Sequence, residues 1–342
     1  MTRTPFRPRI ATALALTLAS ALLLAGCSST TAPAEGGSSA AAGGAFPATL
    51  EHAYGETVIE AEPQRIVTIG WSTHDVVAAL GVVPVAIPKF GWGDDKEGYL
   101  PWFEEKITEL GGEQPVTLDS SEIDFEKLLE LNPDLILAPY SGITEKDYER
   151  LSKIADTVAF PETAWTSDWK ELTRTVGTAL GRSDRAEKLI TDTDASIAAQ
   201  AAAHPEFAGK TFVYSLTLSE GESTMGLYGG SDPRVQIVEQ LGMVSAPEIK
   251  RMDEQGEKAA WNYSLENLDQ LETDVLIAWG DDEGKTLTLE NPMMQQWSPV
   301  ENNHALIFTD SDLVWATSAP TVLSIPWSLD KFVPMLSETV SR

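Results

Sequence analysis

The alternation of short apolar runs with longer amphipathic segments limits the possible folds of this chain more than any other feature. After Pro63 the β-like runs are RIVTIG (65–70), VPVAI (83–87), DLILAP (134–139) and DTVAF (156–160). Segments with helical spacing of apolar residues lie at 74–80, 124–131, 144–154 and 167–180. Because the runs lack strict polar alternation, they predict strands buried on both faces, as in a mostly parallel α/β sheet. Before them, residues 49–61 predict a hairpin that turns near Gly55.

One long helix divides this pattern. Ser183 is a good N-cap, and small or apolar residues recur at helical spacing from Ala186 to Ala201, before Pro205. Beyond it, strands are expected at 210–216, 274–279, 305–309 and 312–317, and helices at 232–241, 264–271 and 328–340. The sequence therefore predicts two α/β lobes, residues 46–181 and 205–342, joined by a helix over 182–204.

The start of the chain has the features of an export signal. Three arginines precede a 16-residue apolar run, Ile10 to Ala25, which is short for a membrane span. The run ends in LAGC (24–27), which resembles a bacterial lipobox, where the signal is removed and the cysteine is lipidated. We expect a signal over residues 1–26, a lipid on Cys27 and a flexible linker through residue 45, on the outer face of the cell membrane. Cys27 is the only cysteine, which excludes an intrachain disulfide.

The chain is strongly acidic, with 52 Asp and Glu against 24 Lys and Arg and a formal net charge of −28. Such a surface repels nucleic-acid phosphates and anionic lipid headgroups. Membrane attachment would therefore depend on the lipid. No later apolar stretch approaches 18 residues, so the body after the linker is expected to be soluble.

Aromatic residues gather where ligands bind in open α/β sheets, at or just past the carboxyl ends of the predicted strands. Three of them belong to the segment KFGWGDDKEGYLPWF (89–103), expected to be a loop with Tyr99 and Trp102 at its rim. The full set is Trp71, Trp92, Tyr99, Trp102, Tyr140, Trp165, Tyr214, Tyr228, Trp279 and Trp315. One tryptophan alone is often core, but a set at one edge predicts a cleft for a bulky or chelated small molecule. Arg234, after GGSDP, could neutralise an anionic ligand.

Signals for catalysis are weak. The motifs GxSxG, GxGxxG, HExxH and the Walker loop are absent. Ser72, His74 and Asp75 adjoin one another at a strand-to-helix turn, where they cannot easily line up as nucleophile, base and orienting acid. A direct metal site wants three or four ligands, and the four histidines (52, 74, 204 and 304) are scattered. We expect no enzyme, cofactor or directly held metal, and keep a secreted hydrolase using Ser72 and His74 as the alternative of another class.

Four stretches, PQRIVTIGWSTHDVVAALGVVPVAI, FEKLLELNPDLILAPYSGIT, LTRTVGTALGRSDRAEKLI and SDPRVQIVEQLGM, carry a resemblance to a known family. In this order they resemble the iron-siderophore branch of the ABC-transporter substrate-binding proteins, from about Leu50 to the C-terminus. The resemblance implies two Rossmann-like lobes joined by one long helix, with a ligand cleft between the lobes. It also implies capture of a ferric siderophore, whose iron stays on the siderophore, and its delivery to an ABC permease for iron uptake. Since the sequence shows no sign of a partner chain, a monomer is expected.

In that family one glutamate per lobe docks onto the permease, and the matching positions here are Glu126 and Glu266. The ligand itself stays open. Basic residues are scarce, and Asp94 and Asp95 argue against a highly anionic ligand, which a ferric catecholate would be. A hydroxamate or a mixed siderophore therefore stays open beside a catecholate. Haem and cobalamin binders share the expected fold and remain alternatives, as does an adhesion or scaffolding module.

Overall fold

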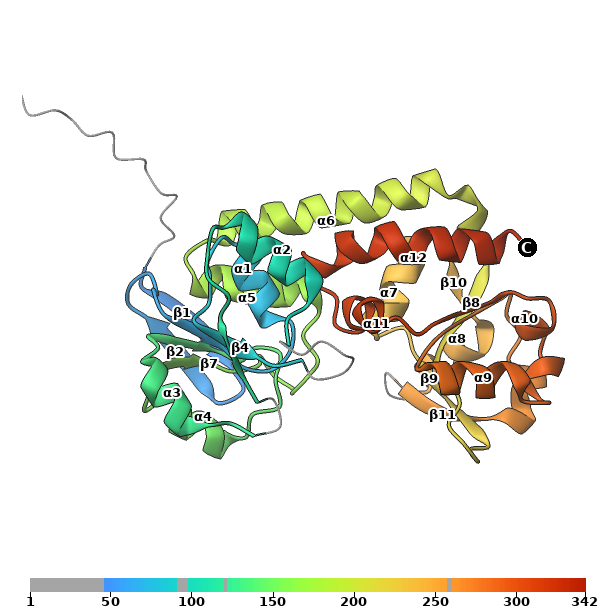
Figure 1. The fold of residues 1–342 in the computed structure, drawn as a ribbon, viewed down its shortest axis with the longest axis horizontal. Coiled ribbons are helices and arrows are strands. Elements are labelled where there is room, and N and C mark those ends of the chain that lie inside the picture. Colours follow the sequence, from blue (N-terminus) through green and yellow to red (C-terminus); the bar gives the residue numbers. More distant parts are fainter. Residues whose placement is uncertain (1–45, 91–97, 120–121, 257–259) are drawn as a thin grey trace, which may run out of the picture. The chain divides into compact units, whose positions relative to one another are not determined.

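A computed structural model describes residues 46–90, 98–119, 122–256 and 260–342 (Figure 1). Those residues form a hairpin and two sheets, each sheet covered by helices. The predicted signal, linker and Cys27 lie outside the described residues, as does Trp92 with Asp94 and Asp95. In the described part of the chain, no helix is both long enough and apolar enough to cross a membrane.

The hairpin consists of β1 (Ala48–His52) and β2 (Gly55–Ile59), paired antiparallel from Ala48 opposite Ile59 to His52 opposite Gly55. Gly55 has a φ of 124°, which a residue with a side chain rarely adopts. Alternate residues of β1 are buried, among them Leu50. The predicted hairpin is therefore confirmed.

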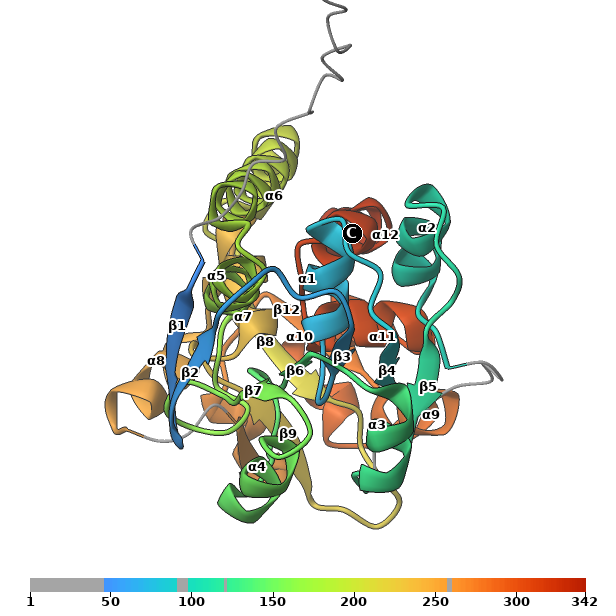
Figure 2. The same ribbon diagram turned by 90° about the vertical axis from the view of Figure 1, so that its left-hand side faces the viewer.

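The first sheet has the order β5-β4-β3-β6-β7, and all its pairings are parallel. Its strands are β3 (Ile66–Thr68), β4 (Ala86–Pro88), β5 (Val116–Leu118), β6 (Leu135–Leu137) and β7 (Asp156–Val158). Its helices are α1 (Thr73–Ala79), α2 (Pro101–Glu109), α3 (Phe125–Leu131), α4 (Glu145–Leu151) and α5 (Trp169–Ala179). Figure 2 shows α1 and α5 on one face of this sheet and α3 and α4 on the other.

Both faces of the first sheet carry hydrophobic cores. Ile66 and Leu135 pack in a cluster with residues of α1 and α5. Their neighbours Val67 and Ile136 point the other way, into a cluster that includes Leu128 of α3. This double burial explains why the strands read as continuous apolar runs.

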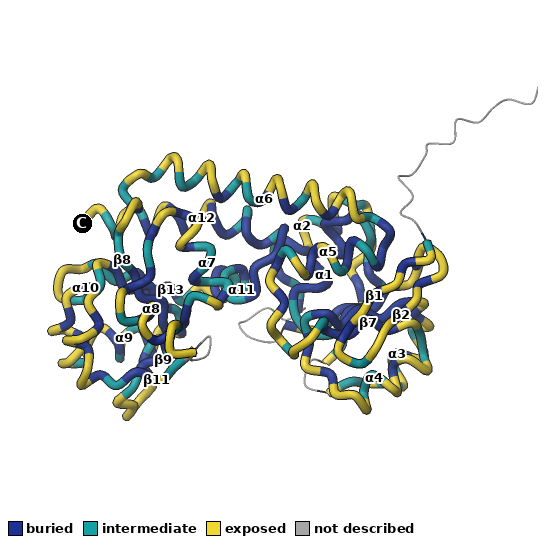
Figure 3. Tube along the Cα trace, turned by 180° about the vertical axis from the view of Figure 1, so that it is seen from behind, coloured by how far each residue is buried: buried dark blue, intermediate teal, exposed yellow. Residues whose placement is uncertain are grey.

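Helix α6 (Ser183–Ala203) has 21 residues, so it is about 30 Å long. Ala186, Ile190, Thr193 and Ile197 recur at helical spacing and are buried. Figure 3 shows exposed residues along the opposite side of the helix. The buried stripe packs against α5 and against the C-terminal helix α12 (Ser324–Val340).

The second sheet has the order β11-β9-β8-β12-β13, with β10 also paired to β8. Its strands are β8 (Thr211–Leu216), β9 (Thr224–Tyr228), β10 (Val244–Ser245), β11 (Ala260–Ser264), β12 (Val275–Trp279) and β13 (Ala305–Phe308). The further helices are η1 (Pro205–Phe207), α7 (Pro233–Gln240), α8 (Pro247–Glu254), η2 (Leu265–Gln270), α9 (Asp282–Glu290), η3 (Met294–Gln296), α10 (Ser298–Glu301) and α11 (Ser311–Ser318). Strands β9 and β11 pair antiparallel, so this sheet is mixed.

Two sequence predictions about elements are wrong, and a third differs only in the type of helix. The expected strand at 312–317 is helix α11, because the Asp310 side chain accepts the Leu313 N–H at 2.8 Å and caps a helix there. The expected loop at 89–103 ends in a helix, since Pro101 occupies the first turn of α2. The helix expected at 264–271 is the 3-10 helix η2.

Candidate ligand site

The turn after β3 fixes the first part of the site. Gly70 has a φ of 86°, and a side chain there would collide with the Tyr140 carbonyl oxygen. The backbone N–H of Trp71 donates to that same carbonyl at 2.9 Å. The carboxyl ends of β3 and β6 are thus held together, and with them Trp71 and Tyr140.

A row of four predicted aromatic side chains continues from this turn. Ring centroids are 5.7 Å apart between Tyr140 and Trp165, 5.6 Å between Trp165 and Trp71, and 5.2 Å between Trp71 and Trp315. Phe90, 5.2 Å from Trp315, extends the row and was not among the predicted site residues. Trp165 is 45 % exposed, so the row offers ring surface to a ligand.

A second group surrounds the one predicted cation. The Arg234 guanidinium carbon lies 4.2 Å from the centroid of the Tyr228 ring and 5.8 Å from that of Trp279. Arg234 Nη1 also donates to Asp232 Oδ2 at 2.8 Å, while its Nε has no hydrogen-bond partner among the described residues. The charge is therefore held in place with donor capacity left over.

The field of Arg234 reaches both groups of rings. Burial raises the pKa of Tyr140, and Arg234 opposes that rise. The same two causes act on the pKa of Tyr228, which burial also raises. Since Tyr140 belongs to the first row and Tyr228 to the second group, the guanidinium lies within electrostatic range of both.

Two of the predicted aromatic residues, Trp102 and Tyr214, lie in the core, and a third, Tyr99, is half-buried. The Trp102 indole N–H donates to Asp75 Oδ2 at 2.7 Å, and the residue is only 4 % exposed, so its expected place at a rim is wrong. Tyr214 is buried against Tyr228, with centroids 5.9 Å apart, and burial raises the pKa of its hydroxyl. The Tyr99 hydroxyl donates to the Pro115 carbonyl at 2.6 Å.

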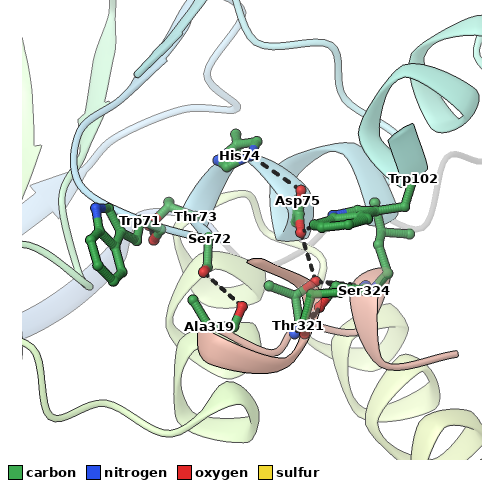
Figure 4. A network of polar contacts seen from close by, with 11 residues as sticks. Trp71, Ser72, Thr73, His74, Asp75, Trp102, Ala319, Thr321 and Ser324 are labelled. Atoms are coloured by element: carbon green, nitrogen blue, oxygen red, sulfur yellow. Dashed lines mark hydrogen bonds and ion pairs between the residues drawn. The ribbon is translucent and has the colours of Figure 1, made fainter. Parts of the chain in front are cut away.

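Ser72 and His74 do not form the pair that a hydrolase would need (Figure 4). The Ser72 hydroxyl donates to the Ala319 carbonyl at 3.0 Å. His74 Nε2 lies 3.2 Å from Asp75 Oδ1, without the geometry of a hydrogen bond, and the imidazole packs on Phe90. Burial lowers the pKa of His74 to about 3, which makes it a poor general base.

A cavity of about 440 Å³ lies outside the carboxyl ends of β3, β4 and β5. Trp71 and Trp165 line it, so it continues the aromatic row, and Thr68 and Phe125 also contribute. This is where an open α/β sheet places its ligand. Among the described residues, no group of three or more His, Cys, Asp or Glu side chains is arranged to hold a metal ion.

The two predicted docking residues are exposed. Glu126 lies in the first turn of α3, and Glu266 lies in the first turn of η2. Lys127, beside Glu126, pairs with Glu130 at 3.1 Å. Both glutamates therefore present carboxylates at the start of a helix.

Comparison with known proteins identifies the family. The family described as periplasmic binding protein matches residues 66–313. The probable siderophore-binding lipoprotein YfiY of Bacillus subtilis is 29 % identical over 264 residues, 76 % of each chain. A crystal structure of PiaA from Streptococcus pneumoniae in complex with ferrichrome is 32 % identical, with a TM-score of 0.77, covering 86 % of this chain and 98 % of that one. A periplasmic solute binding protein from Mycobacterium smegmatis is 27 % identical, with a TM-score of 0.73 and coverage of 86 % and 98 %.

These matches agree with the two α/β lobes, and they confirm the predicted fold class and the family resemblance. The chain belongs to the periplasmic binding protein family.

Proposed function

We propose that this protein captures a ferric siderophore outside the cytoplasm and delivers it to an ABC permease. The observation that carries the proposal is the row from Tyr140 through Trp165 and Trp71 to Trp315, with an exposed ring in its middle. The relatives named for a siderophore or for ferrichrome support the class of ligand. In this proposal the protein binds and releases its ligand without chemistry, and the iron stays on its chelator.

The aromatic row and the cation take different parts of such a ligand. Ring faces of Trp71, Trp165 and Trp315 contact the apolar or conjugated backbone of the chelator. Arg234, on Tyr228 and beside Trp279, donates to a chelating oxygen through its remaining N–H groups. We place Trp92 in the ligand set on sequence grounds alone.

Delivery needs an orientation, and we assign it to Glu126 and Glu266. Two exposed carboxylates, one in each lobe, set the angle at which the protein meets basic residues of a permease. Tethering would come from lipid on Cys27, with residues 1–26 removed and residues 27–45 as the linker. The lobes would then be 46–181 and 205–342, around an interlobe helix at 182–204, and the protein would act as a monomer.

Titration of the purified apo-protein with loaded siderophores tests the proposal. Ferric hydroxamate and ferric catecholate chelates absorb light and should quench tryptophan fluorescence when they lie against Trp71 and Trp165. A rise in melting temperature that saturates with ligand should accompany the quenching. Iron-free chelator is the control for the chelator alone. Ferric citrate is the control for iron supplied without the siderophore.

The same titration separates the alternatives. Saturable binding of haem or cobalamin, with no response to any ferric siderophore, would replace the siderophore by that ligand. No response to any of them would remove the binding function. For the anchor, Cys27→Ala should release the protein from the membrane fraction, and retention of that variant would contradict lipid tethering.

A further inference from the structure

The cation of the site is one half of a largely buried ion pair. Arg234 Nη1 donates to Asp232 Oδ2 at 2.8 Å, and the two side chains are only 12 % and 10 % exposed. Burial raises the pKa of Asp232, and the Arg234 guanidinium opposes that rise, so the arginine helps to keep the enclosed carboxylate ionised. A ligand therefore meets Arg234 as a member of a pair and not as an isolated cation.

The carboxylate of this pair is fixed by the backbone. Asp232 is the N-cap of α7, and its Oδ1 accepts the backbone N–H of Arg234 at 2.9 Å. The loop before it is held as well, because the Gly230 N–H donates to Asp253 Oδ2 of α8 at 3.0 Å. One oxygen of Asp232 thus caps the helix while the other binds the guanidinium, and the negative charge keeps its place when a ligand approaches.

The two charges oppose each other at the rings around them. Burial raises the pKa of Tyr140 and of Tyr228, while Arg234 acts to lower both pKa values and Asp232 acts to raise both. An ionised tyrosine is an anion at the site, so it experiences what an anionic ligand would experience there: attraction by the guanidinium and repulsion by the carboxylate. Asp232 therefore weakens the field that Arg234 exerts on both groups of rings.

We infer that Asp232 is a specificity-determining residue, which cancels much of the charge of Arg234 and so favours a neutral ferric chelate over an anionic one. The inference rests on the proposed function and narrows it. Ferric iron forms a neutral complex with three hydroxamates, which carry one negative charge each, and a trianion with three catecholates, which carry two. The guanidinium donates to a chelating oxygen of the neutral complex, whereas the carboxylate beside it repels a net negative charge.

A series of ferric chelates built on one tripodal backbone tests the dependence on ligand charge. The three arms end in three hydroxamates, in two hydroxamates and one catecholate, or in three catecholates. The net charge of the ferric complex is then zero, minus one or minus three. By titration calorimetry the wild type should bind the neutral chelate most tightly and the trianion roughly tenfold more weakly at low salt, and added salt should reduce the difference.

Substitutions at position 232 separate the charge from the helix cap. Asp232→Asn removes the charge and keeps an oxygen that can cap α7. It should weaken the neutral chelate about two- to threefold, because the guanidinium loses a partner, and should strengthen the trianionic chelate roughly tenfold. The singly charged chelate should change by an amount between these. Asp232→Ser, which also caps a helix, should shift the three affinities in the same order.

Asp274→Asn is the matched control. Its carboxylate also binds a backbone N–H, that of Thr211 at 2.8 Å, but Asp274 precedes β12, whose far end is Trp279. The strand separates the two by about 17 Å, so this substitution should change each affinity less than about twofold at physiological salt. The double variant Asp232→Asn with Arg234→Gln again has no net charge at the pair, and it should lose the gain in affinity for the trianion.

The outcomes are distinct from those of the proposed function. Weaker binding of all three chelates by both Asp232 variants would give this residue a purely structural role and overturn the inference while siderophore binding stands. Wild-type protein that binds the trianion as tightly as the neutral chelate would overturn it too, and that comparison needs no variant to fold. Failure of every ferric chelate to bind the wild type would instead refute the proposed function.

Discussion

The Asp75 carboxylate accepts a 2.8 Å hydrogen bond from the hydroxyl of Thr321, which lies 246 positions further along the chain. Both groups are fully buried. Asp75 belongs to α1, and Thr321 lies between α11 and α12, so the bond ties a helix of the first lobe to the connection that leads into the C-terminal helix (Figure 4). The Ser72 bond to Ala319 joins the same two segments.

Thr321→Val should destabilise the protein by about 1–3 kcal/mol, because it leaves Asp75 with one donor fewer and removes an acceptor. The Thr321 hydroxyl also accepts the Ser324 N–H at 3.0 Å, at the start of α12. Urea unfolding measures the change. Thr286→Val, at an exposed helical site where the hydroxyl bonds only within its helix, is the control and should stay within about 0.5 kcal/mol. Equal effects of the two substitutions would refute the role of Thr321.

Replacing either His74 or Asp75 should leave a folding stability that depends on pH, and the two substitutions should give dependences of opposite sign. Burial raises the pKa of Asp75 from 3.8 to about 7, so between these values the folded state holds the extra proton and stability falls as pH rises. Burial lowers the pKa of His74 from 6.5 to about 3, so between these values the unfolded state holds the extra proton and stability falls as pH falls. In the wild type the two slopes oppose each other between about pH 4 and 6.5.

Asp75→Asn leaves the histidine slope, so this variant should lose stability relative to wild type as pH falls from 6.5 to 4. His74→Gln leaves the aspartate slope and should gain relative stability over the same change. Each slope is at most about 1.4 kcal/mol per pH unit. Melting temperatures of the three proteins at pH 4.5, 5.5 and 6.5 check this, and parallel curves would contradict it.

Gly70→Ala should both destabilise the protein and weaken ligand binding. The new methyl group would meet the Tyr140 carbonyl in addition to the strain of a φ of 86°. We expect a loss of more than about 2 kcal/mol. Gly111→Ala is the matched control, since Gly111 has a φ of 67° but open space around it, and it should cost only about 1 kcal/mol. Similar losses at both sites would show that the close approach at Gly70 does not matter.

Trp165→Ala should weaken binding of a ferric chelate about tenfold and change stability by less than about 1 kcal/mol, because the ring is 45 % exposed. Trp165→Phe should restore part of the affinity. Met293→Ala removes a side chain of similar exposure, 46 %, outside the aromatic row and should leave binding unchanged. Unaltered affinity in Trp165→Ala, by titration calorimetry, would remove Trp165 from the ligand set.

The double variant Glu126→Ala with Glu266→Ala should bind its ligand normally and abolish iron uptake in cells. Its control is Glu130→Ala with Glu290→Ala, two exposed helical glutamates whose loss gives the same net charge. Radioactive iron uptake and ligand titration are measured for both. Weakened ligand binding in the first variant, or full uptake by it, would mean that the docking assignment is wrong.

The sequence predicted most strands of the first lobe because β3, β4 and β6 are buried along their whole length, whereas β5, whose Val116 is 42 % exposed, was not predicted. Apolar runs such as 134–139 and 156–160 are buried when they form strands covered by helices, and they contain β6 and β7. Helix α6 was equally clear, since Ala186 to Ile197 form one continuous stripe. Local pattern and global fold agree in these elements.

Capping and register were harder to predict. DLVWAT (312–317) has the composition of a strand, yet Asp310 caps a helix that begins at Ser311. Trp315 is therefore a helical residue and not a strand-end residue, although its ring still contacts that of Trp71. Trp102 was expected at a rim because its neighbours in the sequence do not show that its indole N–H binds a carboxylate. That carboxylate, Asp75, lies 27 positions away. Such partners are decided by tertiary packing, which one sequence does not display.

The acids that line the cavity outside β3, β4 and β5 were missed for a related reason. Asp119 and Glu122 lie in the connection between β5 and α3, Asp147 lies in the first turn of α4, and in a chain with 52 acids none of them stands out. The rule that ligands bind past the carboxyl ends of strands was applied to aromatic residues alone. Thr68 lay inside the predicted strand 65–70, and no strand was predicted at 116–118, so neither Thr68 nor Asp119 stood at a predicted strand end.

The order of strands in the first sheet has a consequence for how the chain folds. Strand β3 pairs with β4, which follows closely, but also with β6, where Ile66 lies opposite Leu135. Closing that second pairing orders a loop of about 70 residues, at an entropic cost on the order of 4 kcal/mol. Until β6 has been synthesised, one edge of β3 stays unpaired, and an apolar strand with an open edge is prone to aggregation. Folding of this lobe should therefore be limited by a late, long-range step, and a chaperone that shields β3 would act before β6 arrives.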